Sequence, residues 1–342
     1  MVRLWFLVNS NENPTEIQAT AELPGDLFEN AKYHGKRKAL VGSILKDPIP
    51  FTTHFENTSN RRIFILRHGE RVDHVFPGFE TLCFDEAGNY TKKDLNMPKC
   101  LPERENPAEN WKRDSPLTNL GLYQAELVGK SMLESGQTFD TVLCSPSYRC
   151  IQTCDTFLNA MQLRDKVKIC VEPALYEWIG WLPLIGLDEL GDFFTPEQLL
   201  QMGFNIDTDY NPILTINDLK ARSDESFDSS IDRNHAPVQE ALKNTNCKNL
   251  LIVGHGSSLL VNVLKFISSE KNNTDILNSL RKGAYCGIVG IEEDDDHENW
   301  KWITPPLVSL THGVNGDHGT ERLLKFIRYL DRYTKSADRK QK

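Results

Sequence analysis

Short apolar runs recur along the middle of the chain, and most are followed by a polar loop and an amphipathic segment. Three of these runs are continuous, which favours strands that are buried on both faces of a mostly parallel sheet. The expected strands cover residues 63–66, 140–144, 167–171, 249–253 and 285–292. Helices are expected between them, at residues 118–136, 146–163 and 257–269.

Local signals support two of these helices. The first follows a capping threonine, Thr118, and stops near Gly136. The second has Ser145 at its cap and Pro146 in its first turn. The apolar face of the first helix contains Leu122, Ala125, Val128 and Met132. Alternation of strands and helices predicts an α/β fold.

The two ends of the chain have a different character. Residues 1–60 mix polar stretches with prolines and show little periodicity, so we expect an N-terminal extension of unknown role. Residues 333–342 form a charged tail, and the folded domain is expected at 61–332. The acidic run at 292–298 is expected to be a solvated turn rather than a metal site.

Composition narrows the classes of function. The chain has 342 residues and a formal net charge of −9, which argues against nucleic-acid and membrane-surface partners because both favour a basic face. Residues 4–8 are too short an apolar stretch for a signal-peptide core, and the apolar run at 250–264 is interrupted by a histidine and two glycines. The eight cysteines contain no CxxC pair, which favours reduced thiols in a cytoplasmic protein and no metal site.

Cationic residues follow three of the expected strands. They are Arg67, His68, Arg71, Arg149 and His255. Because the carboxyl ends of parallel strands meet at one edge of a sheet, these side chains are expected to lie together. Guanidinium groups bind phosphate oxygens in pairs, and a neutral imidazole can attack phosphorus. Taken singly, His255 has the alternative of a packed turn residue, and each arginine that of a surface or loop residue.

Longer stretches resemble a known family. The chain is similar to the histidine phosphatase superfamily, also called phosphoglycerate mutase-like, and within it to the catalytic domain of the Sts/TULA proteins and of ecdysteroid-phosphate phosphatase. The resemblance covers roughly residues 61–325 and rests on 66-LRHGERVD-73, 143-LCSPSYRCIQT-153, 171-VEPALYEW-178, 203-GFNIDTDYNP-212, 251-LIVGHGSSL-259 and 302-WITPPLVSLTHG-313. It implies a three-layer α/β/α sandwich, no cofactor, and a possible homodimer.

The resemblance also implies roles for single residues. His68 is the expected nucleophile, with Arg67, Arg71 and Arg149 binding the phosphoryl oxygens and His255 joining them as a donor. Glu177 is the expected general acid. The aromatic residues beside it could stack on a substrate ring or belong to the core: Tyr176, Trp178 and Trp181.

The expected function is therefore a metal-independent phosphomonoesterase that forms a phosphohistidine. Its substrate is expected to be a phosphotyrosine protein or a small-molecule phosphate ester that is bulky and hydrophobic, such as a steroid phosphate. One alternative is a catalytically weak interaction protein of the same fold. A phosphoglycerate mutase is less favoured, because mutases of the superfamily carry a small residue and a tryptophan-asparagine pair after RHGE, where this chain has Arg71-Val72-Asp73.

Overall fold

The computed structural model describes residues 60–244, 246–267, 283–295, 297 and 299–303. The chain divides into two units, residues 1–50 and residues 51–342, and all described residues belong to the second. The expectations for the N-terminal extension (apart from Asn60) and for the charged tail concern residues outside this set.

The described strands form one sheet. They are β1 (Arg62–Arg67), β2 (Thr141–Cys144), β3 (Cys170–Val171), β4 (Asn249–Gly254), β5 (Ile288–Glu293) and β6 (Trp300–Ile303). The order across the sheet is β3-β2-β4-β1-β5-β6. The pairs from β3 to β1 are parallel, whereas β5 and β6 join antiparallel at the other edge. The expectation of a mostly parallel sheet is confirmed.

Helices connect the strands. The α-helices are α2 (Val72–Val75), α3 (Phe79–Leu82), α4 (Pro107–Arg113), α5 (Asn119–Glu134), α6 (Tyr148–Ala160), α7 (Pro196–Gln201), α8 (Ile216–Lys220), α9 (Phe227–Lys243) and α10 (Ser258–Val261). Two 3-10 helices, η2 (Pro173–Leu175) and η3 (Ile179–Ile185), lie between β3 and α7. The expected Thr118 cap of α5 is present, since its hydroxyl accepts a hydrogen bond from the Gly121 N–H. Gly136, at a φ of 77°, follows the helix end.

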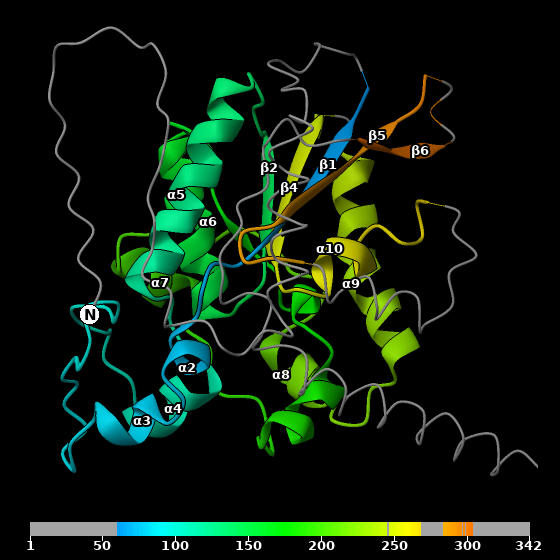
Figure 1. The fold of residues 1–342 in the computed structure, drawn as a ribbon. Coiled ribbons are helices and arrows are strands. Elements are labelled where there is room, and N and C mark those ends of the chain that lie inside the picture. Colours follow the sequence, from blue (N-terminus) through cyan, green and yellow to red (C-terminus); the bar gives the residue numbers. More distant parts are fainter. Residues whose placement is uncertain (1–59, 245, 268–282, 296, 298, 304–342) are drawn as a thin grey trace, which may run out of the picture. The chain divides into compact units, whose positions relative to one another are not determined.

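Apolar residues cover both faces of the central strands. In β1, Phe64 and Leu66 pack in one core cluster with residues of α5 and α6, whereas Ile63 and Ile65 pack in a second cluster with residues of α9 and α10. This division follows from the two-residue period of a strand. Figure 1 shows α5 and α6 on one side of the sheet and α9 and α10 on the other. The three-layer α/β/α sandwich is therefore confirmed.

Several expected elements differ in their limits. Strand β5 begins at Ile288 rather than at residue 285. Helix α6 begins at Tyr148 with Ser147 as its N-cap, so the expectation of Ser145 at the cap is wrong. Strand β3 is only two residues long, because Ile169 forms an isolated bridge with Ile206 instead. Helix α10 ends at Val261; the chain beyond it continues through tighter turns with hydrogen bonds to the third residue back.

The start of the acidic run is not a solvated turn. Glu292 and Glu293 belong to β5 and are buried. Their carboxylates pair with Arg62 and Arg61 at the beginning of β1. The prediction is wrong for these two residues because strand pairing brings arginines beside them, which a single-strand pattern does not reveal.

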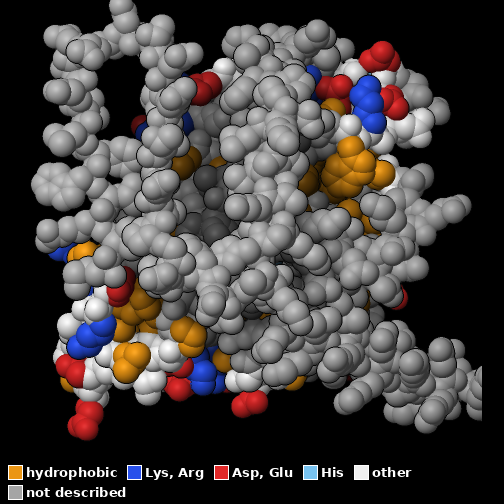
Figure 2. All heavy atoms as spheres, in the orientation of Figure 1, with side chains coloured by type: hydrophobic (Ala, Val, Ile, Leu, Met, Phe, Trp, Pro, Cys, Tyr) orange, Lys and Arg blue, Asp and Glu red, His pale blue; other side chains and the backbone are white. Residues whose placement is uncertain are grey.

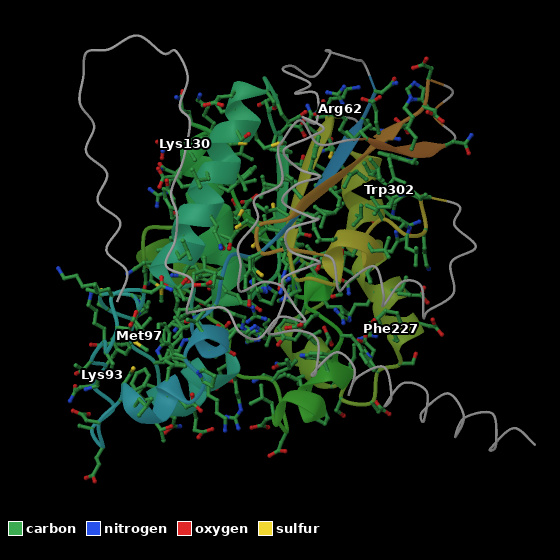
Figure 3. The ribbon with its side chains drawn as sticks, viewed as in Figure 1. Arg62, Lys93, Met97, Lys130, Phe227 and Trp302 are labelled. Carbon is green, nitrogen blue, oxygen red and sulfur yellow. The ribbon has the colours of Figure 1, made fainter. Side chains whose placement is uncertain are left out.

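The far edge of the sheet exposes an aromatic residue. Figure 2 shows hydrophobic side chains at the surface where Figure 3 labels Trp302 of β6, whose exposed fraction is 44%. None of the described helices combines the length and the apolar character needed to cross a membrane.

Candidate active site

Three loops meet where β1, β2 and β4 end. Strand β4 lies between the other two, with Arg67 of β1 opposite Gly254 and Cys144 of β2 opposite Val253. Each strand therefore ends at the same level of the sheet, which brings His68, Arg149 and His255 together. The His68 and His255 ring centroids lie 5.7 Å apart.

His68 is held in a defined orientation. Its backbone N–H donates to the Gly254 carbonyl (2.9 Å), and its own carbonyl accepts from the Cys286 N–H (3.2 Å). The ring Nδ1 lies 2.8 Å from the Gly69 carbonyl oxygen. Because a carbonyl only accepts, Nδ1 carries the proton and Nε2 keeps its lone pair.

Burial keeps this imidazole neutral. The exposed fraction of His68 is 3%. Its pKa lies well below the ordinary value of 6.5, first because burial penalises the charged form and then because the Arg149 and Arg67 guanidinium groups repel a further positive charge. A neutral imidazole with a free Nε2 is the form that can act as a nucleophile.

Two glycines allow the loop after β1 to approach helix α5. A Cβ at Gly69 would lie 2.4 Å from the Gly121 carbonyl oxygen, and a Cβ at Gly121 would lie 2.3 Å from the Glu70 carbonyl oxygen. The Gly69 N–H donates to Thr153 Oγ1 (3.0 Å), whose hydroxyl donates to the Arg149 carbonyl (2.7 Å). The loop carrying His68 is thereby fixed to the helix carrying Arg149.

Arg149 has N–H groups from which no described residue accepts a hydrogen bond. It lies in the first turn of α6 and is 1% exposed. Its Nη2 donates to Glu177 Oε1 (2.9 Å) and lies 3.2 Å from His255 Nδ1. Its Nε and Nη1 have no hydrogen-bond partner among the described residues, although Nη1 lies 3.8 Å from Asp114 Oδ1. Buried guanidinium N–H groups without partners are suited to an oxyanion.

His255 is fixed from both ring nitrogens. Its Nε2 lies 2.8 Å from Ser145 Oγ, and its Nδ1 faces Arg149. Since arginine only donates, Nδ1 is the acceptor in this arrangement and Nε2 carries the proton. Donation to a phosphoryl oxygen needs the other tautomer, which the Ser145 hydroxyl permits because it can donate to Nε2. Burial, followed by the charges of Arg149 and Arg71, lowers the pKa of His255 well below 6.5.

The two remaining arginines are placed differently. Arg67 lies with its Cζ 4.4 Å from the Tyr285 ring centroid, donates from Nη1 to the Gly283 carbonyl, and has a buried Nε without a partner in the described set. Arg71 donates from Nε and Nη2 to the two carboxylate oxygens of Asp73, each at 2.7 Å. Two of the three Arg71 nitrogens are therefore already occupied.

The Glu177 carboxylate lies beside Arg149 and His255. Its Oε1 lies 2.9 Å from Arg149 Nη2 and 3.6 Å from His255 Nδ1, and its side chain is 22% exposed. Two of the neighbouring aromatics belong to the core, whereas Trp181 is only partly buried against the cluster that contains Trp178. Tyr176 packs on the His255 and Phe193 rings, and Trp178 packs on Phe227.

The structure thus brings together His68, Arg149, His255 and Glu177. Arg67 and Arg71 lie near enough for their charges to lower the pKa of both histidines. Sequence reasoning missed their supports: Ser145, Thr153, Asp73, Asp114 and Tyr285. Asp73, Ser145 and Thr153 lie inside the matching stretches, which mark their positions but give none of them a role. Tyr285, in contrast, lies far along the chain, and nothing in its local pattern marks it. Among the described residues, no group of three or more histidine, cysteine or acidic side chains is placed to hold a metal.

Comparisons with known proteins identify the family. A match to the histidine phosphatase superfamily (branch 1) covers residues 103–182. The ecdysteroid-phosphate phosphatase of Drosophila melanogaster is 41% identical over 260 residues, which is 76% of this chain and 34% of that protein. The ubiquitin-associated and SH3 domain-containing protein B of Mus musculus is 36% identical over 260 residues, 75% of this chain and 40% of that protein.

A solved structure gives the same result. The ecdysone phosphate phosphatase of Bombyx mori, in complex with tungstate, has a TM-score of 0.65 and 31% identity, and the match covers 74% of this chain and 95% of that one. The chain spans about a third to two fifths of the length of the two curated relatives named above.

Proposed function

Because this chain belongs to the histidine phosphatase superfamily, we propose that it hydrolyses phosphate monoesters through a phosphohistidine on His68. One observation carries the proposal. A buried, neutral His68 with a free Nε2 lies close to Arg149, whose buried Nε and Nη1 have no hydrogen-bond partner among the described residues. A nucleophile and an oxyanion site are thus combined.

In the first step, His68 Nε2 attacks phosphorus and the bond to the ester oxygen breaks. The Arg149 and Arg67 N–H groups without partners bind the equatorial oxygens, whose negative charge they neutralise. Glu177, in its protonated form, gives its proton to the leaving oxygen, so the alcohol departs neutral. The products of this step are the alcohol and phosphohistidine.

In the second step, water attacks the phosphohistidine. The Glu177 carboxylate accepts a proton from that water, and the P–N bond breaks to restore the neutral imidazole. Inorganic phosphate then leaves. The proposed two-step reaction needs no cofactor or metal, since the guanidinium groups supply the positive charge that stabilises the phosphoryl oxygens.

We infer that the alcohol is bulky and hydrophobic, either a steroid-like alcohol or the tyrosine side chain of a protein. Two of the relatives are named for ecdysteroid or ecdysone phosphates. Beside His68, the Tyr285 ring lies 5.8 Å away, and its hydroxyl is bonded to His74 Nδ1 (2.7 Å). Tyr285 is buried, as Tyr176 and Trp178 are, whereas His74 is partly exposed. We propose that His74 and the edge of Tyr285 contact this alcohol.

A substrate panel tests the proposal. We expect hydrolysis of para-nitrophenyl phosphate, a steroid phosphate and a phosphotyrosine peptide to persist in EDTA, and to be lost in His68→Ala. That variant should melt near the wild-type temperature, because among the described residues the ring hydrogen-bonds only to the Gly69 carbonyl of its own loop. Near wild-type turnover by His68→Ala would refute the phosphohistidine mechanism.

The same panel separates the alternatives. Exchange between 2- and 3-phosphoglycerate faster than aryl phosphate hydrolysis would indicate a mutase. Failure to hydrolyse any member, with the fold intact, would indicate a binding protein that uses the pocket without turnover. The ratio of steroid phosphate to phosphotyrosine hydrolysis identifies which alcohol is preferred.

A further inference from the structure

A buried ion pair lies behind the loop that carries Glu177. Arg233 of α9 and Glu225 each have side chains that are 1% exposed. Removing two charges from water is costly, so a buried pair contributes to stability less than its short distances suggest. The burial of this pair therefore indicates a role other than a contribution to stability.

The guanidinium of Arg233 has a partner for every N–H. Nε and Nη2 donate to the two carboxylate oxygens of Glu225, each at 2.7 Å. Nη1 donates to the carbonyl oxygens of Ala174 (2.7 Å) and Tyr176 (2.8 Å), and Nη2 reaches that of Glu177 (3.3 Å). One side chain therefore holds three carbonyls of the four residues that end in Glu177.

This segment has little regular structure of its own. It runs from the short helix η2 to η3, so its carbonyls depend on groups from elsewhere. Trp178, directly after Glu177, donates from Nε1 to the Glu225 carbonyl (2.7 Å). Asn234 of α9 adds a weaker contact to the Tyr176 carbonyl (3.3 Å). Arg233 thus holds the backbone up to Glu177, and the Glu225 carbonyl holds the side chain of the residue after it.

The location of α9 fits this task. Figure 3 labels Phe227 at the start of α9, at the opposite end of the sheet from Arg62 at the start of β1. The first turns of α9 consequently lie towards the carboxyl ends of the strands, which His68 and His255 follow. From this backbone the Glu177 side chain reaches Arg149 at 2.9 Å.

We propose that the Glu225–Arg233 pair is a positioning device for the general acid. It keeps the Glu177 carboxyl within reach of the leaving oxygen, without touching the substrate itself. The inference rests on the acid role of Glu177 in the proposed function. A planar fork with five N–H groups is required, because a lysine ammonium cannot bind a carboxylate bidentately and reach three carbonyls at once.

The test compares leaving groups. Arg233→Lys keeps the charge and loses the fork, and Glu225→Gln is a milder change that keeps the shape. Both are assayed with para-nitrophenyl phosphate, whose leaving group needs no proton, and with phenyl phosphate, whose leaving group does. General acid catalysis contributes roughly 10²–10⁴-fold, and displacement of a catalytic group by about 1 Å costs on the order of 10²-fold. We therefore expect kcat on phenyl phosphate to fall roughly 10- to 100-fold more than kcat on para-nitrophenyl phosphate.

Matched measurements separate positioning from general damage. The inhibition constant for tungstate should stay within about twofold of wild type, because Arg149 and Arg67 are unchanged. Arg164→Lys is the control, since Arg164 also binds a carboxylate, that of Asp155, and a loop carbonyl, that of Gly203. Its leaving-group dependence should equal that of wild type.

The outcomes are distinct. Equal losses on both substrates in a folded Arg233→Lys or Glu225→Gln variant would overturn the positioning role. If Glu177→Gln itself slows both substrates equally, the acid role in the proposed function fails first. If Arg233→Lys does not fold, Glu225→Gln decides the question by the same ratio. With both roles correct, adding Arg233→Lys to Glu177→Gln produces no further loss on phenyl phosphate.

Discussion

Replacing Arg149 tests the oxyanion site directly. Arg149→Met keeps the length and most of the volume of the side chain but removes all five N–H groups. In the structure, Nη2 serves Glu177 and His255, whereas Nε and Nη1 have no hydrogen-bond partner among the described residues. Those two nitrogens are the ones available to bind two phosphoryl oxygens.

The expected loss follows from these two donors. A hydrogen bond to a charged group contributes about 1.5–3 kcal/mol, so two of them contribute about 3–6 kcal/mol to binding of the transition state. Since about 1.4 kcal/mol corresponds to a factor of ten, kcat/KM should fall roughly 10²- to 10⁴-fold. The kcat/KM of Arg149→Lys should lie between those of the wild type and Arg149→Met, because lysine keeps the charge and loses the bidentate geometry.

Para-nitrophenyl phosphate turnover and tungstate inhibition measure this effect, with the melting temperature as a check on folding. Arg164→Met is the control, because Arg164 contacts Asp155 and Gly203 and should leave kcat/KM within about twofold. A loss smaller than tenfold in a folded Arg149→Met would refute the assignment of the oxyanion site to this guanidinium.

Two further predictions concern protonation and packing. Because burial and neighbouring arginines lower the pKa of His68 and His255, their ring resonances, assigned by loss in His68→Ala and His255→Ala, should not titrate near pH 6.5 in an NMR experiment. Titration midpoints near 6.5 for both rings would contradict the lowered pKa values. Below that pH the unfolded chain binds more protons than the folded one, so the free energy of unfolding should fall as the pH drops through 6.5. Gly121→Ala should lower the free energy of unfolding by about 1–3 kcal/mol in urea titration, because its Cβ would lie 2.3 Å from the Glu70 carbonyl oxygen. A variant as stable as wild type would show that the two backbones can separate freely.

The sequence predicts the central strands well because their pattern reflects burial on both faces. Strands β1, β2 and β4 each contain an apolar run whose neighbours in the sheet are equally apolar, so no tertiary detail is needed to recognise them. Strand β3 and helix α10 are shorter than expected, since their limits depend on what they meet: Ile206 beside β3, and the tighter turns after Val261.

The candidate active site was likewise predicted only in part. The polar residues directly after the strands could be named from the sequence, because the topology of a parallel sheet determines where strand ends meet. Their supports could not. Arg233 lies 56 positions from Glu177, and only the packing of α9 against η2 brings its guanidinium to that loop. Asp73 illustrates a second limit, because a carboxylate two residues from Arg71 reads equally well as a loop residue.

The N–H groups of Arg67 and Arg149 that have no hydrogen-bond partner among the described residues also make the melting temperature depend on the anions in solution. Buried N–H groups without a hydrogen-bond partner disfavour the folded state. An anion that binds them only in the folded chain adds RT ln(1 + [L]/Kd) to the free energy of unfolding and so raises the melting temperature. Inorganic phosphate, the product of the proposed reaction, is such an anion. A medium rich in phosphate would therefore make the protein harder to unfold and slower to turn over, through the same two side chains.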